Sequence, residues 1–135
     1  MRKILLDTNA YTAFKRGQKD VLAILQHADM IGINTIVLGE LAAGFLSGSK
    51  YKKNLEELNE FLDSPRVTIF SIDEETVAFY AKVYATLRKK GKPIPTNDLW
   101  IAATTLQHGC KLCTFDGHFQ IIENLVIAIT LPPFI

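Results

Sequence analysis

The chain has 135 residues, which is the usual size of one domain, and we expect residues 1–135 to form a single domain. Hydrophobic residues make up 48% of the chain and charged residues 21%, which excludes the apolar-poor, highly charged composition of disordered proteins. The net charge of +1 gives no overall basic excess for binding nucleic acid, and uncharged runs such as 99–110 are far shorter than the roughly 20 residues that span a bilayer.

The predicted first strand is the apolar run Ile4–Leu6, which ends at Asp7. Capping residues follow directly, and the apolar spacing from Ala10 to Phe14 predicts a helix. This apolar opening is much shorter than the roughly 7–15-residue core of a secretion signal, so we expect a cytoplasmic protein.

The second predicted strand is Met30–Ile36, which is apolar and β-branched as in a buried strand. Asn34 and Thr35 are suited to cap the helix that follows, which is predicted to run from Ile36 to Phe45 and to end before Gly48. Glu40 lies one turn inside this helix, between apolar residues.

Two helices and a strand are predicted in the middle of the chain. Apolar residues at helical spacing indicate a helix over Leu55–Leu62, and Pro65 ends it before a short strand at Val67–Phe70. A second helix is predicted over Val77–Leu87, where apolar residues share one face. The apolar residues of the Leu55–Leu62 helix are also a candidate dimer interface.

The last predicted helix is almost entirely apolar and therefore belongs in the core. Thr96 and Asn97 are suited to cap it, and it runs from Asp98 to about His108. Strands are predicted at 111–114 and 125–129. Short apolar strands that alternate with helices predict an α/β fold, with a central, mostly parallel β-sheet flanked by α-helices.

The two cysteines, Cys110 and Cys113, form one C-x-x-C motif. One such motif supplies only half of a zinc site, and the strand-to-helix context of a redox motif is missing. We therefore expect both to pack as small apolar residues.

Four acidic residues are predicted at one edge of the sheet: Asp7, Glu40, Asp98 and Asp116. In open α/β sheets, functional sites form outside the carboxyl ends of the strands. Converging carboxylates repel one another unless a cation is bound, and Mg²⁺ prefers oxygen ligands. Such an ion can activate water for attack on a phosphodiester. Taken singly, three of these acids fit equally well as a helix cap, a first-turn acid and a turn residue.

Four segments contain these acids: Leu5-Leu6-Asp7-Thr8-Asn9, Gly39-Glu40-Leu41 with Gly44, Asn97-Asp98-Leu99-Trp100-Ile101-Ala102-Ala103, and Thr114-Phe115-Asp116-Gly117-His118-Phe119. In this order, and over essentially the whole chain, they resemble the motifs of the PIN domain family, and within it the VapC-like toxins of toxin–antitoxin pairs. Trp100 stands where a smaller aliphatic residue is common.

The resemblance implies a PIN-like endoribonuclease that depends on Mg²⁺ or Mn²⁺, cleaves tRNA or another structured RNA, forms a homodimer and is held inactive by an antitoxin. The matched acids would be the catalytic, metal-binding residues: Asp7, Glu40, Asp98 and Asp116. The polar residues beside them would position the carboxylates or metal-bound waters: Asn9, Asn97 and Thr114. An antitoxin is expected to place a basic side chain among the carboxylates, where its charge replaces that of the cation.

Local basic clusters are candidates for binding the RNA backbone. The first choice is the cluster before Asp98, formed by Arg88, Lys89, Lys90 and Lys92. Two further clusters are Lys15-Arg16 with Lys19, and Lys50 with Lys52-Lys53. Each cluster is equally consistent with ordinary solvated surface.

Three aromatic residues are candidates for stacking on bases, although their spacing is also typical of a core: Phe14, Tyr51 and Phe119. His118 lies two residues after Asp116, and we favour a structural or substrate-facing role for it over proton transfer.

Three other functions fit parts of the pattern. A haloacid-dehalogenase-like phosphotransferase also carries its nucleophilic Asp after the first strand, but it needs a second acid at position 9, which is Asn. A receiver domain needs adjacent acids after the first strand and a lysine after a late strand, and neither is evident. A PIN-like binding module, acting through complex formation, has no need of all four acids, so their presence favours cleavage.

Overall fold

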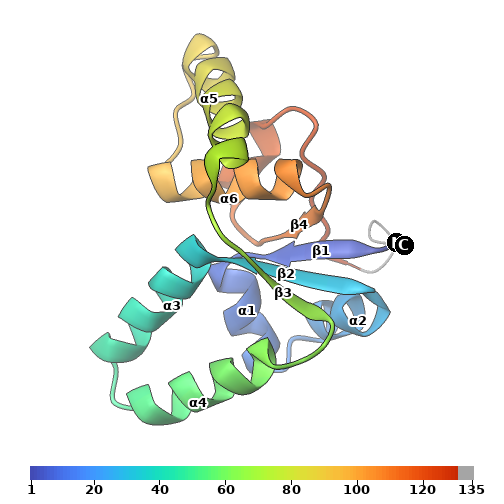
Figure 1. Ribbon diagram of the computed structural model, residues 1–135, viewed down its shortest axis with the longest axis vertical. Helices are drawn as coiled ribbons and strands as arrows, with labels where there is room; N and C mark the ends of the chain where they lie inside the picture. The colour runs from blue at the N-terminus through green and yellow to red at the C-terminus, as the bar shows by residue number, and fades with distance from the viewer. Residues whose placement is uncertain (131–135) are drawn as a thin grey trace.

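A computed structural model describes residues 1–130 and shows a four-stranded sheet with helices against both faces (Figure 1). The strands are β1 (Lys3–Leu6), β2 (Met30–Asn34), β3 (Val67–Phe70) and β4 (Lys111–Cys113), in the spatial order β3-β2-β1-β4. All three strand pairings are parallel. The predicted α/β fold with a parallel sheet is therefore confirmed.

The helices bury apolar side chains on opposite faces of the central strand β1. Ile4 and Leu6 pack with apolar residues of α2 (Lys19–His27), whereas Leu5 packs with those of α3 (Thr35–Ser47) and α6 (Thr96–Gln107). The remaining helices are α1 (Thr8–Lys15), α4 (Tyr51–Leu62), α5 (Glu74–Lys89) and the short 3₁₀ helix η1 (Gly117–Ile121). Because both faces are covered, the buried residues Ile4–Leu6 of this strand are all apolar and do not alternate with polar ones.

The structure corrects the sequence-based boundaries at several points. The second strand ends at Asn34 and not at Ile36, because Asn34 adopts the extended backbone of an N-cap and the helix begins at Thr35. Helix α6 begins at Thr96, with Pro95 at its N-cap and no side-chain cap, so Thr96 and Asn97 are its first residues. Helix α2 was not predicted.

The strand predicted at 125–129 is wrong. There the chain forms only an isolated bridge between Ile127 and Leu112, with Val126 and Ala128 exchanging backbone hydrogen bonds with Leu112 at 2.8 and 2.9 Å. The segment therefore pairs with β4 at a single position and does not form a full strand.

The apolar residues of helix α4 that were predicted as a candidate dimer interface are only partly exposed. Leu58 is buried, and Leu55, Phe61 and Leu62 are half-buried, with Phe61 stacked edge-on to Tyr11 at 5.3 Å between ring centroids. The apolar face of this helix is therefore used inside the molecule. Cys110 and Cys113 are buried and free, as predicted, and burial raises the pKa of the Cys113 thiol to about 12.

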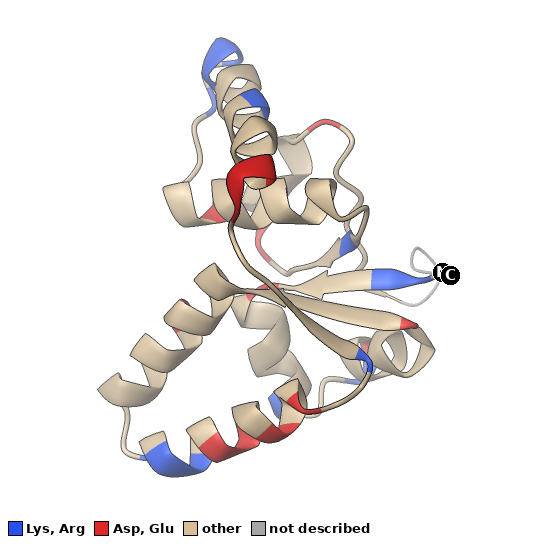
Figure 2. Ribbon diagram, in the orientation of Figure 1, with Lys and Arg blue, Asp and Glu red and all other residues tan. Residues whose placement is uncertain are grey.

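The predicted RNA-binding cluster lies at the end of α5. Arg88 and Lys89 belong to its last turn, and Lys90 and Lys92 follow it. Figure 2 shows this basic group at the tip of α5, away from the sheet. No helix within residues 1–130 is long and apolar enough to cross a membrane.

Asn34 joins two helices and gives a test of the fold. Its side chain is fully buried, accepts a hydrogen bond from the backbone N–H of Val37 at 2.8 Å, and donates one to the Thr104 hydroxyl at 3.3 Å. Asn34→Ala removes the cap of α3 and leaves a buried N–H unpaired. We expect it to lower the free energy of unfolding by roughly 1–3 kcal/mol, measured by urea denaturation.

A matched control is Asn59→Ala, on the exposed face of α4, which should change the free energy of unfolding by less than about 0.5 kcal/mol. Equal unfolding midpoints for the two variants would show that the Asn34 contacts contribute nothing to stability.

Candidate active site

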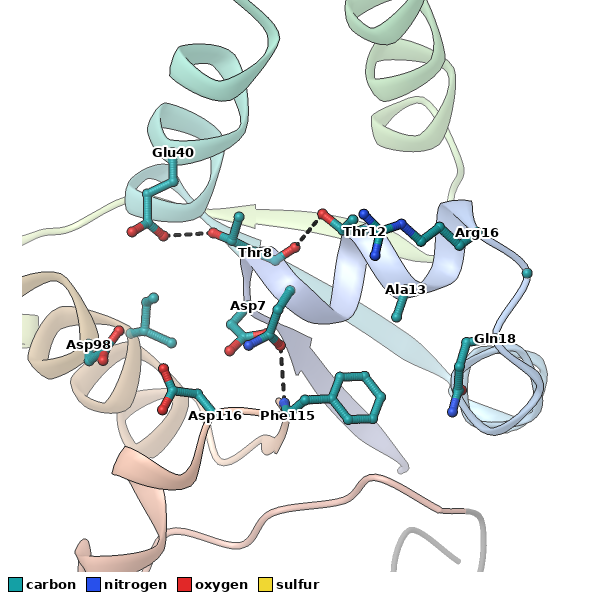
Figure 3. A pocket seen from close by; sticks show the side chains of 13 residues that line it. Asp7, Thr8, Thr12, Ala13, Arg16, Gln18, Glu40, Asp98, Phe115 and Asp116 are labelled. Atoms are coloured by element: carbon teal, nitrogen blue, oxygen red, sulfur yellow. Dashed lines mark hydrogen bonds between the residues drawn. The ribbon is translucent and has the colours of Figure 1, made fainter. Parts of the chain in front are cut away.

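The four predicted acids line one pocket, with a volume of about 710 Å³, at the carboxyl ends of β1 and β4 (Figure 3). Asp7 follows β1 directly, Glu40 comes from α3, Asp98 from the first turn of α6, and Asp116 from the loop between β4 and η1. The structure thus brings together side chains that are more than 100 residues apart in sequence.

Asp7 is the deepest of these acids. It caps α1, its Oδ1 accepts a hydrogen bond from the Ala10 N–H at 3.0 Å, and its Oδ2 accepts one from the Thr114 hydroxyl. Burial raises the pKa of Asp7 to about 6, although both hydrogen bonds lower it, and the nearby charges of Asp116 and Asp98 raise it further. Asp7 is therefore both a helix cap and a member of the acidic group.

Glu40 is held by a hydrogen bond to each carboxylate oxygen. Oε1 accepts a hydrogen bond from the Thr8 hydroxyl at 2.6 Å, and Oε2 accepts one from the Asn97 side-chain amide at 3.3 Å. Asn97 therefore lies where a supporting residue would be expected. Thr8 was missed as a site residue, and its position directly after Asp7 was the available signal.

Asp98 and Asp116 share a histidine. The Nδ1 atom of His118 lies 3.1 Å from Asp98 Oδ2 and 3.1 Å from Asp116 Oδ1, and the backbone N–H of His118 donates to Asp116 Oδ1 at 3.0 Å. Burial raises the pKa of Asp98, whereas the hydrogen bond with His118 lowers it. The hydrogen bond with Asp98 and the charge of Asp116 raise the pKa of His118.

Thr114 and Asn9 connect the acids through the loop after β4. The Thr114 hydroxyl donates to Asp7 and accepts the backbone N–H of Asp116 at 3.0 Å. The Asn9 side-chain oxygen accepts the backbone N–H of Phe115 at 3.0 Å. Both residues therefore hold the loop that carries Asp116 against the start of α1.

A divalent cation fits the chemistry of this pocket. Asp98, Asp116 and His118 offer ligand atoms that all lie within 4.8 Å of one another. Within residues 1–130, neither Asp7 nor Glu40 forms an ion pair, so the negative charge of these two carboxylates has no cationic side-chain partner. Carboxylate oxygens are the ligands that Mg²⁺ prefers.

The other predicted site residues lie elsewhere. The Arg88–Lys92 cluster does not line the pocket, and in it Arg88 donates to the Tyr84 hydroxyl at 3.0 Å while Lys90 pairs with Glu123 at 3.1 Å. Of the candidate stacking residues, Phe119 is buried in the core, Phe14 is half-buried among other rings, and the partly exposed Tyr51 opens α4.

Sequence reasoning did not assign three further residues to this pocket. Arg16, Gln18 and Phe115 line the pocket together with the acids. Arg16 was part of one of the two further basic clusters, and Phe115 was part of a segment that resembles the family motifs. Neither could be assigned to the pocket from sequence alone, because that requires the positions of α1, α2 and the loop after β4.

Comparisons with known proteins agree with this arrangement. A family model described as PIN domain matches residues 4–125. The protein named Ribonuclease VapC2 from Rickettsia felis is 30% identical over 128 residues, covering 91% of this chain and 94% of that protein. The protein named Ribonuclease VapC4 from Mycobacterium tuberculosis is 26% identical over 127 residues, covering 94% of this chain and 96% of that protein.

Solved structures give the same result. VapBC2 from Rickettsia felis, bound to a DNA fragment from its promoter, contains a chain with a TM-score of 0.80 and 28% identity, covering 93% of this chain and 96% of that one. VapBC-1 from nontypeable Haemophilus influenzae contains one with a TM-score of 0.81 and 27% identity, with the same coverages of 93% and 96%.

Proposed function

This chain belongs to the PIN domain family and is related to the VapC ribonucleases, and on that premise we propose that it is an endoribonuclease that uses a divalent cation to hydrolyse RNA phosphodiester bonds. The observation that carries the proposal is the convergence of Asp7, Glu40, Asp98 and Asp116 in one pocket. A binding module that had lost cleavage would not need four acids held by hydrogen bonds. The presence of all four in this pocket therefore favours an enzyme over a binding module.

The residues have distinct tasks in the proposed reaction. Asp7, Asp98 and Asp116 would hold Mg²⁺ or Mn²⁺, with Thr114 fixing the orientation of Asp7 and His118 that of the other two. When bound, the cation supplies water of lowered pKa and neutralises charge that develops on the phosphate.

Glu40 lines the pocket and is oriented by neighbouring side chains. Thr8 and Asn97 each donate a hydrogen bond to one of its carboxylate oxygens. We assign Glu40 to ordering a water molecule for attack on the phosphorus atom, as a hydrogen-bond acceptor.

The proposal predicts metal-dependent cleavage. The purified chain, free of any partner protein, should cut total RNA at discrete positions with Mg²⁺ and should leave it intact with EDTA, because without the cation the pocket repels the phosphate backbone. Sequencing the fragment ends would map the cuts and identify the RNA class, for which tRNA or another structured RNA is our first expectation. A folded, metal-saturated chain that leaves all RNA intact would refute the proposal.

We also propose that an antitoxin binds this chain and that the chain forms a homodimer in the cytoplasm. Support for the antitoxin comes from the solved relatives, which are VapBC complexes, and from the negative pocket, which suits a basic side chain of a partner. An antitoxin that copurifies with the chain should reduce metal-dependent cleavage. Unchanged cleavage in the complex would exclude a basic side chain in the pocket.

A further inference from the structure

The acidic pocket extends beyond the carboxylates to a second end with different chemistry. Figure 3 shows the acids on one side and Arg16, Gln18 and the Phe115 ring on the other. All of these residues line the same pocket. The first end carries the negative charge of four carboxylates, whereas the second carries a positive charge, an amide and an aromatic face.

Arg16 supplies the positive charge. It is the C-cap residue of α1, and its backbone N–H donates to the Thr12 carbonyl at 3.1 Å, which fixes its backbone at the rim. Lys15, beside it, faces Glu57 at 3.6 Å, but no carboxylate within residues 1–130 lies within ion-pair distance of Arg16. The Arg16 guanidinium is thus available to an anion that enters the pocket.

Gln18 adds a neutral donor with a fixed orientation. Its side-chain oxygen accepts the backbone N–H of Val21 at 2.8 Å, where Gln18 caps α2. That bond uses the oxygen, so the amide NH₂ is the part of the side chain left for a ligand. Figure 3 shows the Arg16 guanidinium directed away from Gln18, so the two side chains would meet different parts of a bound ligand.

Phe115 supplies the aromatic face. The side chain, between the site residues Thr114 and Asp116, is 45% exposed. Its backbone N–H is held by Asn9 at 3.0 Å, and Figure 3 shows the ring directed away from the acids, toward Gln18. No other ring within residues 1–130 stacks on it. The hydrogen bonds that organise the site therefore also present a ring face to the pocket.

We propose that this second end is a nucleotide subsite, in which Phe115 stacks on an unpaired base next to the scissile phosphodiester while Arg16 binds the adjoining phosphate. The inference rests on the proposed function and names the residues that would bind one nucleotide of its substrate. A base inside a duplex has both faces covered by its neighbours, so we expect Phe115 to stack on an unpaired base.

Binding can be measured without cleavage. The probe is a single-stranded RNA hexamer with one 2-aminopurine, whose fluorescence falls when the base stacks, and Ca²⁺ replaces Mg²⁺ to neutralise the carboxylates while a gel checks that the hexamer stays intact. The wild-type chain should quench the fluorescence. Phe115→Ala should abolish the quenching and weaken binding about tenfold, and Phe115→Trp should restore both.

Arg16→Ala tests the phosphate contact in the same assay. It should weaken binding of the hexamer and reduce the slope of log affinity against log salt by about 0.7, the value for one phosphate contact to a single strand. The matched controls are Phe79→Ala and Lys82→Ala, both on α5, which remove an exposed ring and an exposed charge outside the pocket.

The outcomes separate this inference from the proposed function. If Phe115→Ala and Arg16→Ala bind the hexamer as the two controls do, the subsite is refuted even in a chain that cleaves RNA. If the wild-type chain cleaves nothing but quenching still depends on Phe115, the subsite stands and the ribonuclease proposal fails. In a chain that does cleave, Phe115→Ala should raise KM and leave kcat nearly unchanged, since stacking is lost equally from substrate and transition state.

Discussion

The Asp98→Asn variant is expected to cleave RNA at least about a hundredfold more slowly than the wild-type chain and to remain folded. Asp98 opens α6 at the pocket and shares His118 with Asp116, so the substitution removes one of the charges that would hold the cation. Charge stabilisation by a bound metal ion is worth several kcal/mol, and each 1.4 kcal/mol is roughly tenfold in rate. Because burial raises the pKa of Asp98, its charged form is disfavoured, and a neutral amide of the same shape should not lower stability.

Cleavage rates on a single RNA substrate with saturating Mg²⁺ test this expectation, with circular dichroism to verify the fold. Asp63→Asn, at the exposed residue that follows α4, removes the same charge outside the pocket and should cleave at the wild-type rate. If the Asp98→Asn variant cleaved RNA as fast as the Asp63→Asn variant, Asp98 would not be a catalytic residue.

The second large effect concerns stability, and it depends on Asp7. The pKa of Asp7 is raised from 3.8 to about 6, so the folded chain binds its proton more tightly than the unfolded chain does. The resulting stabilisation is present below about pH 4 and is lost as the pH rises through about 6. In EDTA at pH 8, the Asp7→Asn variant should therefore be more stable than the wild type, with a free energy of unfolding up to roughly 3 kcal/mol higher.

A bound cation should offset most of this difference. Mg²⁺ at about 100 times its Kd adds roughly 2.7 kcal/mol to the free energy of unfolding of a protein that binds it only when folded. The gain should be present at pH 8 and much smaller at pH 5, where a proton competes for Asp7, and Asp7→Asn should lose most of it. Urea denaturation at both pH values, with Mg²⁺ and with EDTA, measures all of these differences. A cation effect of the same size in Asp7→Asn would place the ion elsewhere.

The parts of the site that follow from local sequence could be predicted. Asp7 and Asp116 each follow a strand, and parallel pairing of β1 with β4 brings those two ends to one edge, so the sheet alone places them together. Glu40 could be predicted because a lone charge among apolar residues near a helix start is costly unless it serves a site.

The remaining features depend on distances that no sequence pattern contains. The contact of one imidazole with both Asp98 and Asp116 depends on how η1 packs beside α6, and the position of Arg16 depends on where α1 ends. The segment around Ile127 has the composition of a strand, but tertiary packing leaves it a single bridge. At this segment, tertiary packing overrides the local preference for a β-strand.

The order of the strands has a consequence for the synthesis of the protein. The central strand β1 is the first made, but its neighbour β4 and the Asp7 partner Thr114 lie 107 residues further along the chain. A nascent chain on the ribosome can pair β1 with β2 early, but it has no complete acidic pocket until residue 116 has emerged. Because such long-range pairing forms slowly, we expect the pocket to be among the last features to assemble, and translation products that end before β4 lack Asp116 and therefore a complete pocket.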